Sequence, residues 1–256
     1  MRRPRRPDVD APALIRDIAR GLEPTSRRAF LKGAAGLGSL TLLTGCDVVD
    51  GQAAESVLKT MSRFNDRVQG WLFDPDKLAP EYPASMIKRP FPFNGFYPAS
   101  QAPVVDGDSY RLELSGKIAE TKPWTLPELT ALPQFTQVTR HICVEGWSEI
   151  GSWTGARFSD FLMRVGADLK QPFVVLRCAD GYFTTIDMAT ALHPQTQMSF
   201  KFADETLPRV YGFPMKLRMP TKLGFKNPKH IVSIEVTDRD AGGYWENEGY
   251  NWFSGV

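Results

Sequence analysis

Apolar residues recur every three or four positions in one stretch near the start of the folded body. This spacing places them on a single face of a helix, and it predicts an amphipathic helix that leads into the rest of the fold. The residues that follow it are Val57, Met61, Phe64, Val68 and Trp71.

A proline-rich stretch follows this helix, over residues 74–103. Proline removes a backbone donor and interrupts helices and central strands. We therefore expect an extended loop that wraps the surface or lines a site. The prolines are Pro75, Pro80, Pro83, Pro90, Pro92, Pro98 and Pro103.

Short strand patterns and short helix patterns alternate beyond residue 103. The turn Ala179-Asp180-Gly181 joins two strand patterns and predicts a hairpin. Thr125 and Glu128 have the spacing of a capping box that opens a helix. Together these signals predict an α+β fold of mixed β-sheets with short helices. The expected strands are 110–114, 173–177, 183–186 and 232–236, and a further helix is expected over 158–165.

Composition limits the kinds of protein that this chain can be. The 256 residues are 42% hydrophobic and 11% aromatic, which is enough to bury a core and excludes a disordered or collagen-like chain. The three cysteines, Cys46, Cys143 and Cys178, are far apart and form no C-x-x-C pair. This excludes a dense disulfide scaffold, a four-cysteine zinc site and a covalently attached c-type haem.

Charge is unevenly distributed along the chain. Residues 1–32 hold nine basic and four acidic residues, a net charge of +5, so the rest carries −3 of the overall +2. A slightly acidic body gives no reason to expect nucleic acid as a partner.

The N-terminal segment has the layout of an export signal. Residues 26–32 read Ser-Arg-Arg-Ala-Phe-Leu-Lys, and the 13 residues from Gly33 to Gly45 are uncharged. That run is shorter than the roughly 20 residues that a membrane span needs. The order resembles a twin-arginine signal, which implies export of a folded protein to the periplasm. The alternative is a chance Arg-Arg pair in a basic tail.

Leu43-Thr44-Gly45 before Cys46 resembles the lipobox of bacterial lipoproteins. The resemblance implies that the thiol of Cys46 is acylated, and Asp47 implies retention at the inner membrane. The alternative is an ordinary small residue near a cleavage point.

The densest concentration of chemistry is the segment from Arg140 to Ser148, which contains His141 and Cys143. A cysteine taken alone is usually a small buried hydrophobe. Positive charge from Arg140 and His141 would instead lower the pKa of the thiol and favour a thiolate that binds metals.

Five blocks of this chain resemble the molybdopterin-dependent oxidoreductases of the sulfite oxidase fold, and among them the periplasmic protein-methionine-sulfoxide reductase catalytic subunits. The resemblance covers about residues 85–250. It implies three parts: a signal peptide over 1–45, a tether with the amphipathic helix over 46–75, and a catalytic domain over 76–256. The blocks are Asn94 to Tyr97, Arg140 to Ser148, Trp153-x-Gly155, Ala179 to Tyr182, and Gly224 to Lys226 running into Ile231 to Ile234.

The resemblance implies a Mo-molybdopterin cofactor with Cys143 as the metal ligand. A thiolate beside the dithiolene sulfurs of the pterin suits molybdenum, which favours soft sulfur ligands. Cys178, Tyr211 and Lys216 stand where the family has threonine, asparagine and arginine, and these departures affect the polarity near the metal. The implied cofactor-binding residues are Asn94, Tyr97, Pro98, Cys143, Cys178, Tyr211, Lys216, Asn227, Pro228 and Lys229.

A basic run over residues 206–234 contains no acidic residue. We expect its side chains to neutralise the phosphate of the cofactor; the alternative is a solvated basic loop. The bases are Arg209, Lys216, Arg218, Lys222, Lys226 and Lys229.

The implied activity is transfer of an oxygen atom to or from a small sulfur-containing substrate, most of all the reduction of oxidised protein methionine. The catalytic residues are then Cys143 and Arg140, with Arg157 and Arg177 as further candidates for polarising the substrate. The chain has no haem or iron–sulfur signature, so a separate membrane cytochrome or other electron carrier is the expected partner.

Other functions stay open at this point. A sulfite oxidase-like enzyme would use the same cofactor in the opposite direction. A non-enzymatic lipoprotein binding module would bury Cys143, and a zinc or thiol hydrolase would use the histidines. His193 is expected to end a helix and bond a carbonyl, and His230 to contact the cofactor. The C-terminal aromatic cluster, residues 244–253, is expected to pack in the core or to line a substrate face.

Overall fold

The structure is a computed structural model that describes residues 51–256. The expected signal peptide, the lipid attachment at Cys46 and the start of the expected tether lie outside the described residues.

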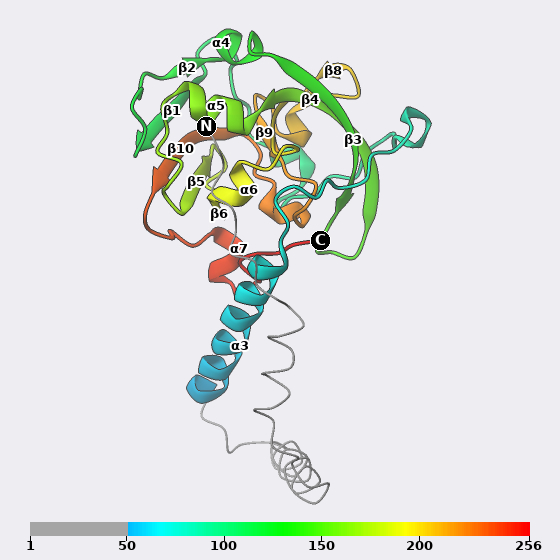
Figure 1. Ribbon diagram of the computed structural model, residues 1–256. Helices are drawn as coiled ribbons and strands as arrows, with labels where there is room; N and C mark the ends of the chain where they lie inside the picture. The colour runs from blue at the N-terminus through cyan, green and yellow to red at the C-terminus, as the bar shows by residue number, and fades with distance from the viewer. Residues whose placement is uncertain (1–50) are drawn as a thin grey trace, which may run out of the picture. The chain divides into compact units, whose positions relative to one another are not determined.

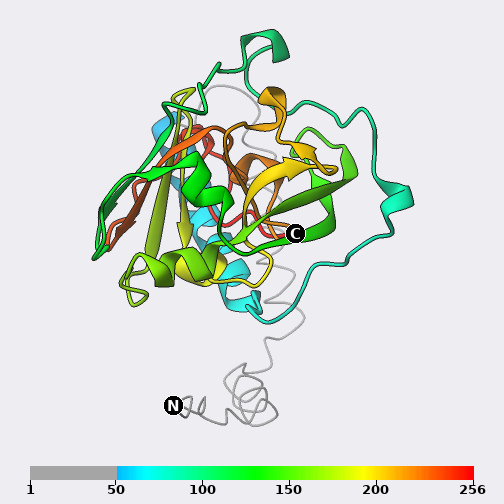
Figure 2. The same ribbon diagram turned by 90° about the horizontal axis from the view of Figure 1, so that it is seen from above.

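Two five-stranded β-sheets form the framework of the described residues (Figures 1 and 2). The first has the order β2-β1-β10-β5-β6; the second has the order β3-β4-β7-β8, and β9 pairs with β7. Neighbours are antiparallel except β1 and β10, which run parallel. The strands are β1 Arg111–Gly116, β2 Trp124–Thr125, β3 Gln134–Ile142, β4 Ser148–Arg157, β5 Phe173–Cys178, β6 Phe183–Asp187, β7 Gln197–Phe202, β8 Glu205–Thr206, β9 Lys216–Arg218 and β10 Ile231–Thr237.

Short helices and turns connect these strands, and α3 precedes them. Among the helices that the structure describes, none combines the length and the apolar character that crossing a bilayer requires. The helices are α3 Gly51–Leu72, α4 Leu126–Thr130, α5 Phe158–Arg164, α6 Met188–Ala191 and α7 Tyr244–Asn247, and the 3₁₀ turns are η1 Ala84–Met86, η2 Ala99–Gln101, η3 Arg209–Tyr211 and η4 Gly224–Lys226.

The α+β fold predicted from the sequence pattern is confirmed. The side chain of Thr125 accepts a bond from the Glu128 backbone N–H, and the Glu128 carboxylate accepts one from Thr125, which completes the capping box of α4. Strands β5 and β6 form the expected hairpin, and β1 and β10 cover the other two strand patterns. The expected helices over 57–71 and 158–165 are α3 and α5.

The proline-rich stretch is an extended loop, as its composition predicts. Residues 74–103 contain only the two short turns η1 and η2 and an isolated bridge from Glu81 to Thr139. This loop carries residues 94–97 to the site described below.

The main hydrophobic core joins the two sheets and α5. Leu112, Leu176 and Ile234 enter it from the first sheet, Met198 enters it from β7, and Phe158 enters it from α5. Burial of such side chains contributes about 1.5–3 kcal/mol each. A smaller cluster around Phe91, Trp153 and Phe202 supports the second sheet beside the site.

Candidate functional site

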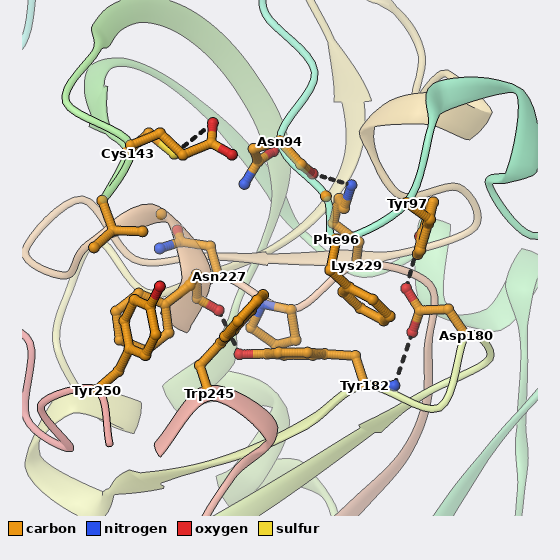
Figure 3. A pocket seen from close by; sticks show the side chains of 16 residues that line it. Asn94, Phe96, Tyr97, Cys143, Asp180, Tyr182, Asn227, Lys229, Trp245 and Tyr250 are labelled. Atoms are coloured by element: carbon orange, nitrogen blue, oxygen red, sulfur yellow. Dashed lines mark hydrogen bonds between the residues drawn. The ribbon is translucent and has the colours of Figure 1, made fainter. Parts of the chain in front are cut away.

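One pocket brings together residues from five separated parts of the chain (Figure 3). They come from the proline-rich loop, the turn after β3, the turn after β5, the segment around η4, and the region from α7 to residue 250. The lining residues are Asn94, Gly95, Phe96, Tyr97, Cys143, Val144, Glu145, Asp180, Tyr182, Gly224, Phe225, Asn227, Pro228, Lys229, Trp245 and Tyr250.

Cys143 is fixed at the tight turn that joins β3 to β4. Its N–H donates to the Trp147 carbonyl at 2.9 Å, and its carbonyl accepts from Gly146 N–H at 3.2 Å. Gly146 has φ +91°, a conformation that glycine adopts without strain. The turn therefore presents one free thiol, 6% exposed, to the pocket.

The thiol of Cys143 lies next to a carboxylate. Its Sγ is 3.6 Å from Glu145 Oε2, which also accepts from Trp147 Nε1 at 3.0 Å. Burial is the main cause that raises the pKa of the Cys143 thiol, and the charge of Glu145 raises it further. In the protein alone the group is a protonated thiol, so binding a metal must displace its proton.

Three buried cations surround the inner side of this site without a carboxylate partner. Lys216, Arg218 and Lys229 are 1%, 0% and 8% exposed, and no acidic side chain of residues 51–256 lies within ion-pair distance of them. Burial lowers the pKa of Lys216, with Lys229 and Arg218 as further causes, and it lowers the pKa of Lys229 to about 8. The protein itself therefore leaves this positive charge without a direct carboxylate partner, and only the more distant Asp180 raises the pKa of Lys229.

Neutral groups hold these cations in place. The Lys229 ammonium donates to the Asn94 carbonyl at 2.5 Å and lies 4.3 Å from the centre of the Phe93 ring. The Lys216 ammonium lies 4.7 Å from the centre of the Trp153 ring. Such contacts fix the geometry of a cation without cancelling its charge.

Arg218 connects the strand that leads to Cys143 with the loop that carries Asn227. Its guanidinium donates to Thr139 Oγ1 at 3.2 Å, to the Arg140 carbonyl at 2.5 Å and to Asn227 Oδ1 at 3.0 Å. Burial lowers its pKa to about 9.

His141 is buried behind the pocket with both ring nitrogens unpartnered. Its ring packs against Phe91 and Trp147, with centroid distances of 5.8 and 5.7 Å. A Cβ on Gly224 would lie 2.5 Å from His141 Nε2, so only glycine fits there. Burial, and then the charges of Lys216 and Arg218, lower the pKa of His141 far below its usual value.

Some of the cofactor-binding residues that the sequence predicts line the pocket, and others lie outside it. Asn94, Tyr97, Cys143, Asn227, Pro228 and Lys229 line the pocket. Lys216 lies behind it, where a Cβ on Gly212 would come within 3.2 Å of Lys216 Cβ and 3.0 Å of Lys229 Cβ.

Pro98, Cys178 and Tyr211 lie outside the pocket lining. Pro98 precedes the turn η2. Cys178 is buried at the end of β5, where burial and then the charge of Asp180 raise the pKa of its thiol. Tyr211 donates to the Phe91 carbonyl at 2.7 Å. The structure therefore does not place these three residues in the pocket lining.

The three arginines considered for the substrate do not line the pocket. Arg140 is exposed on the opposite side of β3 from His141, donates to Tyr82 Oη and Ser148 Oγ, and lines another cavity. Arg157 donates to the Pro194 carbonyl, and Arg177 pairs with Glu235 at 3.8 Å.

Aromatic side chains form much of the opposite wall of the pocket (Figure 3). Phe96, Tyr182, Trp245 and Tyr250 line it, and Tyr244 stacks on Phe96 with ring centroids 4.8 Å apart. The C-terminal aromatic cluster therefore reaches the site. The sequence alone did not decide between core packing and lining a substrate face for this cluster. Two further residues were not named from the sequence: Glu145, beside the thiol, and Asp180, whose carboxylate accepts from Tyr97 Oη at 2.7 Å.

The other two histidines have structural partners. His193 lies just after α6, and its Nε2 is 3.0 Å from the Lys77 carbonyl, as expected. His230 is buried with Nδ1 2.7 Å from the Phe213 carbonyl, and it does not line the pocket.

The remaining buried bases of the run over 206–234 have acidic partners of their own. Lys222 lies 3.8 Å from Asp187, and Lys226 bonds Glu246 at 2.5 Å. Arg209 is exposed and donates to the Ala102 carbonyl. Only part of the run predicted to neutralise the cofactor therefore faces the site.

Comparisons with known proteins agree on one family. The oxidoreductase molybdopterin binding domain matches residues 99–245. The chain is 59% identical over 241 residues, 94% of this chain and 92% of the relative, to a protein of Azospira oryzae whose name proposes it as the protein-methionine-sulfoxide reductase subunit YedZ1.

In more distant relatives the part that matches this chain is a smaller share of their length. Over 229 residues the chain is 28% identical to the mitochondrial sulfite oxidase of Drosophila melanogaster. This match covers 72% of this chain and 39% of the sulfite oxidase. The sulfane dehydrogenase SoxCD from Paracoccus pantotrophus shares the fold with a TM-score of 0.52 and 17% identity, over 55% of this chain and 41% of the other.

Proposed function

We propose a function from the premise that this chain belongs to the family of oxidoreductases with a molybdopterin binding domain. It is an α+β enzyme of the sulfite oxidase type, and its cofactor is Mo-molybdopterin. Its proposed reaction is the reduction of a sulfoxide, with oxidised methionine in proteins as the substrate. The single observation that carries the proposal is a free thiol in a pocket bordered by buried cations that have no carboxylate within ion-pair distance.

The residues present fit this cofactor. Cys143 supplies one soft sulfur ligand at a fixed turn, as molybdenum requires. Lys216, Arg218 and Lys229 supply buried positive charge for an anionic pterin phosphate. Asn94, Tyr97, Asn227 and Pro228 would hold the pterin from the pocket wall, while Pro98, Cys178 and Tyr211 position that wall.

The bound molybdenum centre supplies two-electron transfer of an oxygen atom. Reduction of a sulfoxide consumes two electrons and two protons and yields a sulfide and water. The aromatic wall of Phe96, Trp245 and Tyr250 binds the apolar part of a thioether side chain. Glu145 lines the pocket beside Cys143 and can hold a proton at Oε2 for the departing oxygen.

The pocket favours a sulfoxide over sulfite. Sulfite is a small anion and would need a free cation at the entrance. Arg140, Arg157 and Arg177 all lie outside the lining, and Lys229, which does line the pocket, would be paired with the phosphate of the cofactor. A sulfoxide is neutral, and it suits a wall made mainly of aromatic side chains. Sulfite oxidation is the second candidate, and the likeness to sulfite oxidase supports it.

The protein is further proposed to work in the periplasm. The segment 26–45 supports export by the twin-arginine route, and the lipobox before Cys46 supports an anchor in the inner membrane. Electrons would come from a separate membrane carrier, since the chain has no haem or iron–sulfur signature.

Elemental analysis of the exported full-length protein tests the cofactor. We expect molybdenum near one atom per chain in the parent and a loss of it in Cys143→Ser. Cys178→Ser changes the other described thiol, which lies outside the pocket lining, and should keep at least half of the metal. Molybdenum that is absent from the parent, or equally present in Cys143→Ser, would contradict the proposal.

Kinetics on the loaded enzyme test the substrate. Reduction of protein-bound methionine sulfoxide is assayed with a reduced viologen as electron donor, and sulfite oxidation is assayed with cytochrome c as electron acceptor. We expect kcat/KM for the sulfoxide to be at least tenfold higher than kcat/KM for sulfite. A faster reaction with sulfite would favour the second candidate.

A further inference from the structure

Helix α3 exposes its apolar face instead of burying it. Its large apolar side chains are 59–82% exposed. At 100° per residue these positions fall on one side of the helix, and Val68 on the same side is partly buried. We call this set the α3 stripe; it consists of Leu58, Met61, Phe64, Trp71 and Leu72.

Two polar side chains of α3 hydrogen-bond to the C-terminal segment; in Figure 1 this segment passes beside the C-terminal end of α3. Asp66 Oδ1 accepts from Asn251 Nδ2 at 2.6 Å and from Phe253 N–H at 2.9 Å. Gln69 Oε1 accepts from Gly255 N–H at 3.1 Å. A surface helix normally turns its apolar side inward. In α3 the polar Asp66 and Gln69 contact the domain while the large apolar side chains stay exposed, so these side chains can face a different apolar phase.

The exposed apolar surface continues beyond the helix. Leu72 also lines a cavity of about 570 Å³, together with Leu78 and Val256. Leu78 is 55% exposed and Val256 is 56% exposed. Leu72 therefore belongs both to the α3 stripe and to the lining of this cavity.

The chemistry of the helix matches the interface of a phospholipid bilayer. Phe64 and Trp71 are aromatic residues of the kind that anchor helices at the headgroup level. Arg63 and Arg67 are exposed and border the stripe, where they can contact anionic headgroups. An exposed stripe flanked by basic residues is typical of helices that lie in the interface.

The preceding sequence brings α3 to such a surface. An uncharged run, Gly33 to Gly45, ends at Cys46, and four residues separate Cys46 from the start of α3. Five residue steps span at most about 18 Å. An attachment of the chain to a membrane at Cys46 would therefore keep α3 close to the bilayer.

We propose that α3 lies in the membrane interface with the α3 stripe inserted among the lipid chains. It thereby holds the enzyme domain at the bilayer surface, where a membrane electron carrier would reach it. This inference goes beyond the proposed function and does not rest on it, because α3 is separate from the pocket.

The test starts from the full-length protein and cleaves the chain just before α3. A specific protease site replaces residues 47–50, and the protein is purified from membranes and reconstituted in vesicles of phosphatidylethanolamine and phosphatidylglycerol. After cleavage, flotation measures the fraction that stays with the vesicles. We expect the parent to stay bound. The triple variant Met61→Ser, Phe64→Ser, Trp71→Ser should bind at least about tenfold more weakly, because it loses most of the inserted apolar area.

A matched control removes three exposed apolar residues elsewhere: Met86→Ser, Val104→Ser and Met163→Ser. It should bind like the parent. Quenching by brominated lipids gives a second readout: it should be strong in the parent and largely lost in Trp71→Phe.

Three results would overturn the proposal. The cleaved parent could leave the vesicles, the triple variant could bind as well as the parent, or quenching could persist in Trp71→Phe. A dimer in solution that only the triple variant abolishes would assign the α3 stripe to a second copy of the chain, and it would overturn the proposal as well.

Discussion

Two groups of buried cations, close together in the sequence, have opposite surroundings. Near the C-terminal segment, Lys226 bonds the buried Glu246 carboxylate at 2.5 Å and the Thr185 carbonyl at 2.7 Å, and Lys222 lies 3.8 Å from Asp187. Around the pocket, Lys216 and Lys229 have no carboxylate of residues 51–256 within ion-pair distance.

This difference separates a structural charge from a binding charge. A buried ion is costly unless it is paired. Lys222 and Lys226 are paired by the protein itself, so they belong to the fold in every state of the enzyme. Lys216 and Lys229 have no such partner, and we propose that the anionic cofactor supplies it when it binds. The comparison predicts that removing a member of each group has opposite effects on stability and on cofactor retention.

The largest expected effect is on cofactor binding in Lys216→Met. Loss of a charge-assisted contact should weaken cofactor retention about 10- to 100-fold. The cofactor-free protein should be as stable as the parent or slightly more stable, because an uncompensated buried charge is gone. Molybdenum per chain after dialysis and denaturant unfolding of the cofactor-free form measure the two effects.

Lys222→Met is the matched control, since it removes a buried lysine of the same run that has its own acidic partner. It should retain molybdenum like the parent. Equal loss of metal in both variants would break the distinction between the two groups.

The next effect is on stability in Glu246→Gln. The change leaves the Lys226 ammonium buried without a counter-charge, which should lower the free energy of unfolding by about 3–5 kcal/mol. The loss should be the same with and without cofactor, as measured by denaturant unfolding. The double variant Lys226→Met, Glu246→Leu should recover most of it; a double variant as unstable as Glu246→Gln would contradict the account.

A smaller effect concerns the pH dependence of stability. Burial lowers the pKa of Lys229 to about 8, below the usual value of 10.5. The unfolded chain therefore binds the proton more tightly, and the free energy of unfolding should rise by about 1 kcal/mol per pH unit from about pH 8 to about pH 10. Below pH 8 the cost of the charged lysine is fully present.

Bound cofactor should remove this rise, since its anion stabilises the charged lysine. Unfolding measured against pH for the cofactor-free protein, the loaded protein and Lys229→Met checks this. Lys222, whose pKa burial lowers to about 7, contributes equally to all three and does not affect the difference. The same slope in loaded and cofactor-free protein would refute the assignment of Lys229 to the anion.

The smallest effect is expected for a surface cation. Arg177 is half exposed and pairs with the partly exposed Glu235, and such pairs contribute at most about 1 kcal/mol. Arg177→Gln should change kcat/KM by less than twofold in steady-state assays. A tenfold loss would show that Arg177 reaches the substrate after all.

Local elements could be predicted from the sequence because their signals are local. Thr125 and Glu128 close the capping box within one helical turn, and the turn at Gly181 joins two adjacent strands. The role of Cys143 came from the resemblance of its surrounding segment to a family. The parallel pairing of β1 with β10 lies beyond any local signal, because more than 100 residues separate the strands.

The direction in which single side chains point also could not be predicted from the sequence. Arg140 and His141 are neighbours, yet β3 sends them to opposite sides of the sheet, since side chains alternate along a strand. The aromatic residues of the C-terminal segment reach the pocket only because the chain returns to it. The amphipathic character of α3 was clear from its spacing, but not that its polar side would face the domain.

The sequence by itself determined α3, α4, α5 and the four strands β1, β5, β6 and β10, together with the family and the concentration of positive charge in one run. These properties depend on residue types and on their spacing along the chain. The tertiary structure decided which of the six bases face a ligand, because a charge is compensated by its neighbours in space. It placed Asp187 and Glu246 beside Lys222 and Lys226 and left Lys216 and Lys229 without an acid. This placement distinguishes the lysines that the fold pairs with an acid from the lysines at the pocket that it leaves without one.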